Sequence, residues 1–219
     1  IAKYTLLALW IIAIAILISI GIKQASEVAY EGKTVQKETI NVLPNDTLFV
    51  KFRYNEYYTK DIDDRESFKF VQDSANTQLI YSNNVSLEIL RTDEKLPFIQ
   101  IEKIARGKSF QDAKQRAEKI KYAIKIEGNQ LILDNYLLTA VENKFRGQEV
   151  EIYLYLPKGT IFQTDESFSN FDRSDYEFFD ENEFDTKNPV FKVNQDKVNC
   201  LNCSSEEIDD SLSVKIETG

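Results

Sequence analysis

The chain has 219 residues, with 27 Lys and Arg against 36 Asp and Glu, a net charge of −9 and no histidine. The lack of histidine excludes serine–histidine and cysteine–histidine catalysis, histidine zinc sites and histidine pH sensing. The seven glycines include no pair at the spacing of a phosphate-binding loop. For these two reasons we expect no enzyme and no cofactor. The acidic net charge disfavours nucleic acid and anionic lipid surfaces as partners, so we also expect no nucleic-acid binding.

An uncharged apolar run opens the chain, from Tyr4 to Ile22. As a helix it would span about 28 Å, close to the hydrocarbon thickness of a bilayer. We therefore expect residues 1–23 to form a single transmembrane helix, residues 24–46 a polar linker and residues 47–219 one domain. A cleaved signal peptide is the alternative, although no small-x-small cleavage site follows the run. Because the sequence starts at Ile1 and not at Met, we expect further protein upstream.

Short alternations of apolar and polar residues follow the linker, with polar turns between them. In the first, Leu48, Val50 and Phe52 share one face of a strand. Similar segments follow at 79–81, 85–92, 98–106, 122–127, 130–138, 150–156, 160–164, 191–193 and 212–216. Many short strands at this spacing predict a mainly β domain, either a sandwich or a β-solenoid.

One segment has helical spacing instead. Ser109 and Asp112 form a capping signature, and apolar residues recur after it at Phe110, Ala113 and Ala117. We predict a short amphipathic helix over residues 110–120, which packs on a sheet.

The most unusual segment is residues 165–186, which hold nine acids and six aromatic residues. One interpretation is a surface for a basic partner, formed by Asp165, Glu166, Phe168, Phe171, Asp172, Asp175, Tyr176, Phe178 and Phe179. Another is a solvated loop whose phenylalanines partly pin it to the domain. A calcium loop starting at Asp172 is disfavoured, because Glu177 stands where such a loop needs glycine. We therefore assign no metal ligands here.

Cys200 and Cys203 are the only cysteines. A Cys-x-x-Cys pair can be redox-active, half of a metal site or a local disulfide. The acidic residues that follow would raise a thiol pKa, and no second pair completes a zinc site. A structural disulfide is the favoured interpretation if the domain faces an oxidising compartment.

Several motifs together resemble a known family. The run SFQDAKQRAEKIKYAIKIEGNQLILDNYLLTAVENKFRGQEVEIYLYLPKGT and the later CLNC are similar to the C-terminal half of Bacteroidetes proteins of the phage-shock-protein-C (PspC) type. The resemblance covers the membrane helix and essentially all of the remaining chain. It implies a toastrack domain, a β-solenoid-like stack of short strands, and a link to envelope stress. It also implies an extracytoplasmic domain with Cys200 and Cys203 oxidised to each other, and it supplies no catalytic residues.

We therefore expect a non-enzymatic sensory or protein-interaction domain of a PspC-like membrane stress protein. The expected location is the inner (cytoplasmic) membrane, with the domain on the extracytoplasmic side. Expected partners are the membrane, other membrane or envelope proteins, or further copies of the chain. Two alternatives remain open: an adhesin-like structural β-solenoid at the cell surface, and a cation-binding or small-molecule-binding module.

Overall fold

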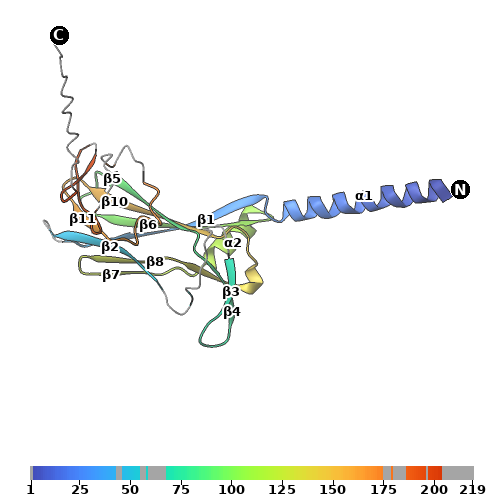
Figure 1. Ribbon diagram of the computed structural model, residues 1–219, viewed down its shortest axis with the longest axis horizontal. Coiled ribbons are helices and arrows are strands. Elements are labelled where there is room, and N and C mark those ends of the chain that lie inside the picture. Colours follow the sequence, from blue (N-terminus) through green and yellow to red (C-terminus); the bar gives the residue numbers. More distant parts are fainter. Residues whose placement is uncertain are drawn as a thin grey trace, which may run out of the picture.

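The computed structural model describes residues 2–42, 46–54, 58, 68–174, 179, 186–195 and 197–203. In Figure 1 a long helix, α1 (Ala2–Ser26), stands apart from a domain of strands and leaves it at one end. Within the part of the chain that the structure describes, Lys3–Ser26 is the one helix long and apolar enough to cross a membrane. Its apolar side chains are exposed on all sides. Such a helix suits a bilayer better than a protein core, as the sequence predicted.

The first sheet contains four strands in the order β1-β6-β10-β5. Strand β6 is antiparallel to β1 and β10, and β10 is parallel to β5. Alternate residues of β10 are buried, which confirms the period-two pattern of the sequence. The bounds are β1 (Tyr30–Thr39), β5 (Val85–Thr92), β6 (Phe98–Gly107) and β10 (Glu149–Pro157).

Strand β1 corrects our assignment of residues 24–46 to a polar linker. It pairs with β6 along its whole length. Most of its side chains are exposed at the sheet edge, so it lacks the apolar alternation that reveals a strand. Main-chain hydrogen bonds hold it, together with close packing on Gly32, where a Cβ would lie 2.5 Å from the backbone nitrogen of Lys114. The β domain therefore begins at Tyr30 and not at residue 47.

The second sheet contains six strands in the order β13-β12-β11-β2-β8-β7. Strand β2 lies between β11 and β8 and is parallel to both. Leu48, Val50 and Phe52 of β2 are buried, as predicted. The bounds are β2 (Thr47–Arg53), β7 (Ile124–Glu127), β8 (Gln130–Asp134), β11 (Ile161–Thr164), β12 (Val190–Val193) and β13 (Val198–Cys200).

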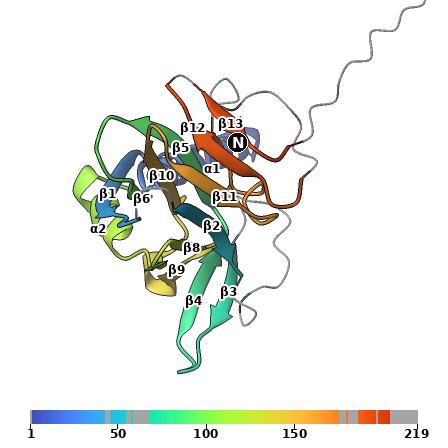
Figure 2. The same cartoon turned by 90° about the vertical axis from the view of Figure 1, so that its left-hand side faces the viewer.

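A third, smaller sheet has the order β3-β4-β9, with β3 (Phe68–Gln72), β4 (Gln78–Ser82) and β9 (Leu137–Ala140). A single turn of 3₁₀ helix, η1 (Val141–Asn143), follows β9. Figure 2 shows the β3–β4 hairpin projecting from the two larger sheets, which lie beside each other. One core joins those two sheets, and its fully buried side chains include Leu48, Leu87, Ile99, Leu131, Leu154 and Phe162. The mainly β stack expected from the sequence is confirmed.

Helix α2 (Phe110–Glu118) confirms the predicted capped helix, although it ends two residues earlier than the expected 120. The Ser109 hydroxyl accepts a hydrogen bond from the backbone N–H of Asp112 at 3.2 Å. Ala113 and Ala117 are fully buried. Helix α2 packs on β1 and β6, and it covers the end of these two strands that is nearest to α1 (Figure 1).

Candidate functional site

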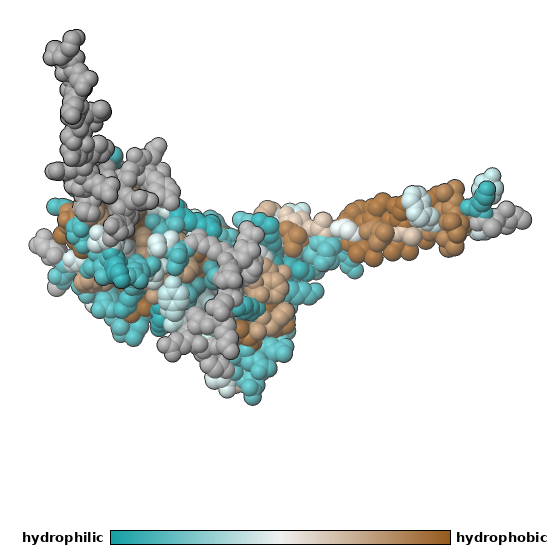
Figure 3. All heavy atoms as spheres, viewed as in Figure 1, coloured by the Kyte–Doolittle hydropathy of each residue, from teal (hydrophilic) through white to brown (hydrophobic). Residues whose placement is uncertain are grey.

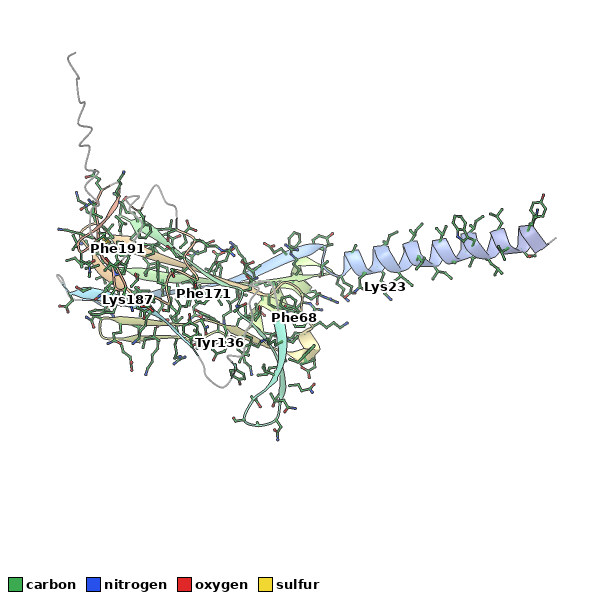
Figure 4. The ribbon with its side chains drawn as sticks, viewed as in Figure 1. Lys23, Phe68, Tyr136, Phe171, Lys187 and Phe191 are labelled. Carbon is green, nitrogen blue, oxygen red and sulfur yellow. A yellow bond between two sulfur atoms is a disulfide. The ribbon has the colours of Figure 1, made fainter. Side chains whose placement is uncertain are left out.

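The acidic aromatic segment lies on the side of the domain away from α1, and Figure 4 places its Phe171 midway along the domain. Figure 4 places Lys187 and Phe191, which border this segment, at the end of the domain opposite α1, and Lys23 on the other side of the domain. The structure describes residues 165–174, Phe179 and Thr186 of the segment. Of the predicted surface residues, Asp175, Tyr176 and Phe178 lie outside the described residues. We use the name distal surface for Asp165, Glu166, Asp172 and the residues around them.

Two Asp-x-Ser turns fix the segment. Asp165 Oδ1 accepts hydrogen bonds from the Ser167 backbone N–H, at 2.9 Å, and from the Ser167 hydroxyl. The Ser167 Oγ in turn accepts from the backbone N–H of Phe52 on β2, at 2.9 Å. This chain of hydrogen bonds joins the start of the segment to the six-stranded sheet.

The second turn repeats the arrangement seven residues later, on the other sheet. Asp172 Oδ1 accepts from the Ser174 backbone N–H at 2.9 Å and from its hydroxyl. The Ser174 Oγ accepts from the backbone N–H of Ile89 on β5 at 2.8 Å. Leu87 also exchanges backbone hydrogen bonds with this stretch, at its N–H and its carbonyl. Residues 165–174 therefore join the two large sheets to each other.

The phenylalanines of the segment belong to the core. Phe168, Phe171 and Phe179 are 5–6% exposed. The Phe171 ring lies 4.3 Å from that of Phe52, and the Phe179 ring lies edge-on to Phe191 at 5.4 Å. Burying one such side chain stabilises a fold by about 1.5–3 kcal/mol. These rings therefore pin the segment, as one of our two interpretations held.

A pocket of about 360 Å³ opens between the segment and β12. Its floor includes Phe168, Phe179 and Phe191, and its rim carries Asp165, Glu166 and Lys187. Glu166 and Lys187 form an exposed ion pair at 3.4 Å across the rim. Exposed pairs of this kind contribute little stability, so both charges are accessible to a partner.

Burial shifts the pKa of the third carboxyl, that of Asp172. Desolvation raises the pKa of Asp172 above its ordinary value, against the opposing effect of the hydrogen bonds from Ser174. The part of the chain described here contains no group of three or more Cys, Asp and Glu side chains that could hold a metal ion. One oxygen each of Asp165 and Asp172 already accepts hydrogen bonds within a turn.

The two cysteines reinforce the same end of the domain. Cys200 and Cys203 form a disulfide with their Cα atoms 5.6 Å apart. Within the enclosed loop, the Asn202 side chain accepts from the backbone N–H of Val190 at 2.8 Å and donates to the carbonyl of Asn188 at 3.1 Å. The loop is thereby fastened to the start of β12, next to the pocket wall.

Sequence reasoning missed several members of the site. The serines of the two turns were not singled out, although the repeat Asp-x-Ser at 165–167 and 172–174 was a readable signal. Lys187 and Phe191 were missed because nothing in the local sequence says that β12 returns beside the segment.

One comparison with known proteins gives a match. A family model described as "ToastRack found in some PspC" matches residues 71–206. The match covers strands of all three sheets, helix α2, the distal surface and both cysteines. No curated protein and no solved structure matches the chain.

Proposed function

Because the chain belongs to the family of ToastRack domains found in some PspC proteins, we propose that it is a non-enzymatic, membrane-anchored interaction module that senses envelope stress. Helix α1 holds the domain at the membrane, and the domain presents its distal surface to a basic segment of another envelope protein. The observation that carries the proposal is the pocket with an apolar floor and an acidic rim, in the half of the domain away from the helix.

The chemistry of the distal surface supports binding over catalysis. Catalytic acid–base pairs need carboxyls that are free to exchange protons with a substrate. Here Asp165 and Asp172 are engaged in turns that join the sheets, and the chain has no histidine. A rigid, sheet-mounted rim suits a partner that supplies lysine or arginine, since charge-assisted hydrogen bonds to carboxylates are strong and directional.

The disulfide supports a location for the domain outside the cytoplasm. Such bonds persist in oxidising compartments and are rare in the bacterial cytosol. In this proposal α1 lies in the inner membrane and the β domain on its extracytoplasmic side.

Photo-crosslinking in cells tests the proposal. A photoreactive residue replaces Ser169, which is exposed at the pocket, and in a matched control it replaces Lys125, which is exposed on β7. We expect a stress-dependent crosslink to one envelope protein from position 169 and none from 125. A further substitution, Glu166→Lys, should abolish that crosslink. Equal crosslinking from both positions, or none from 169 under any envelope stress, would contradict the proposal.

A further inference from the structure

The end of the domain that faces α1 differs in character from the distal surface. Residues 103–121, which include α2, hold seven Lys and Arg against two acids, although the whole chain has a net charge of −9. The described acids of residues 165–186, which are Asp165, Glu166 and Asp172, line the pocket farther from α1. We expected no affinity for anionic lipid because the net charge is negative. The net charge does not reveal that the basic and acidic residues lie in different parts of the domain.

Two contacts hold this end close to the membrane helix. Glu27, the residue directly after α1, forms an ion pair with Arg146 at 3.4 Å. Tyr30, the first residue of β1, lies edge-on to Phe110 of α2 with ring centroids 5.0 Å apart. Glu27 follows the last apolar residue, Ile22, by five positions, or about 7 Å of helix. A bilayer has roughly 5–7 Å of headgroup layer on each side, so these contacts lie at its outer boundary.

Apolar side chains are exposed beside those contacts. Phe110 is 69% exposed and Tyr30 is 43% exposed. Phe68 and Phe70 of β3 are also exposed, and Phe68 stacks on Phe145, the neighbour of Arg146. Figure 4 places Phe68 at the end of the domain from which α1 leaves, and Figure 3 shows apolar surface there. Aromatic residues of this kind are favoured at the level of lipid headgroups.

Basic side chains accompany the aromatic ones. Lys108 lies two residues before Phe110, and Lys144 lies two residues before Arg146. Both are exposed. Among the described residues, neither has a carboxylate within ion-pair distance, so both ammonium groups can bind a phosphate.

We infer that this end of the β domain docks on the headgroup layer of the membrane that α1 spans, with Phe110 and Tyr30 at the headgroup boundary and Lys108 and Lys144 on anionic lipid phosphates. The occupant is the lipid itself, because α1 ends at Ser26, close to Tyr30, which contacts Phe110, and next to Glu27, which pairs with Arg146. Docking would hold the domain upright and keep the distal surface pointing away from the membrane. The inference rests on the membrane placement of α1 in the proposed function and not on any partner of the distal surface.

The test uses the full chain in lipid vesicles. Trp10 is the single tryptophan, so Trp10→Phe removes the background signal, and Phe110→Trp then reports on this end of the domain. The matched control is Phe49→Trp in the same background, because Phe49 is an exposed phenylalanine on β2 (37%). We expect lipids brominated near the headgroup to quench the tryptophan at position 110 several-fold more than the one at position 49. Equal and weak quenching at both positions would overturn the docking.

Lipid composition tests the lysines. A basic residue near an anionic surface gains about 1 kcal/mol, or about fivefold in the ratio of docked to undocked domains. Adding an anionic lipid to zwitterionic vesicles should therefore increase quenching at position 110, and Lys108→Glu with Lys144→Glu should remove the increase. If neither the anionic lipid nor the lysine substitutions change the quenching at position 110, the lysines do not bind lipid phosphates. The absence of a crosslink from position 169 would not change the quenching results. Partner binding by the distal surface and docking on the membrane are therefore tested separately.

Discussion

Replacing Gly32 by alanine separates two accounts of the segment after α1 by the sign of the effect. In a flexible linker, Gly→Ala is neutral or stabilises by about 0.4–1 kcal/mol, because it reduces the entropy of the unfolded chain. In the structure, the new Cβ would lie 2.5 Å from the backbone nitrogen of Lys114 and 2.8 Å from the backbone carbon of Ala113. Both are main-chain atoms of α2, so the helix itself must move. Overpacking of this kind costs about 1–3 kcal/mol.

The assay is urea unfolding of the full chain in mild detergent, followed by the near-ultraviolet circular dichroism of its tyrosines. With an m-value of about 2 kcal/mol/M, the expected loss lowers the midpoint by about 0.5–1.5 M. Gln36→Ala, an exposed position on the same strand, is the matched control and should stay within about 0.5 kcal/mol of wild type. A Gly32→Ala midpoint equal to or above that of wild type would refute the packing of α2 on β1.

Four further outcomes are expected. Ser109→Ala removes the α2 cap and should lower the free energy of unfolding by about 1 kcal/mol, whereas an unchanged denaturation midpoint would argue against the cap. Burial raises the pKa of Asp172 above 3.8, so the folded chain binds this proton more tightly than the unfolded chain does. The free energy of unfolding should therefore fall as pH rises from about 3.8 to the folded pKa. Asp172→Asn should flatten that part of a plot of Tm against pH, and an unaltered slope would contradict the raised pKa of Asp172. Neither chelator nor calcium should shift Tm, and a rise of several degrees with calcium would restore the cation-binding alternative. The double substitution Cys200→Ser, Cys203→Ser should cost at most about 2 kcal/mol, because the closed loop is tiny, and both wild-type thiols should resist labelling in cells until reductant is added.

The sequence predicted those elements whose information is local. The alternation in β10 and the cap at Ser109 depend on neighbouring residues, and both are present in the structure. Strand β1 escaped prediction because it is an edge strand that is held by main-chain pairing and by a glycine contact. Neither feature leaves an apolar pattern in the sequence.

The candidate site was predictable only where its features are local in the sequence. The density of acids and phenylalanines in residues 165–186 marked the segment, and the burial of Phe168 and Phe171 agrees with the loop being pinned. The role of Ser167 depends on the main chain of β2, more than 100 residues earlier. Such a contact is a property of the tertiary fold, so no pattern within the segment could reveal it.

In the proposed function, the distal surface transmits envelope stress by binding a partner. The most direct measurement is the output of an envelope-stress reporter in cells that express the full chain with Glu166→Lys, compared with Glu127→Lys. Each substitution reverses an exposed carboxylate that is paired with a lysine, one at the pocket rim and one at the end of β7. We expect Glu166→Lys to abolish the chain-dependent response and Glu127→Lys to retain it, with both variants folded and in the membrane. An unchanged response in Glu166→Lys would show that the distal surface does not transmit the signal.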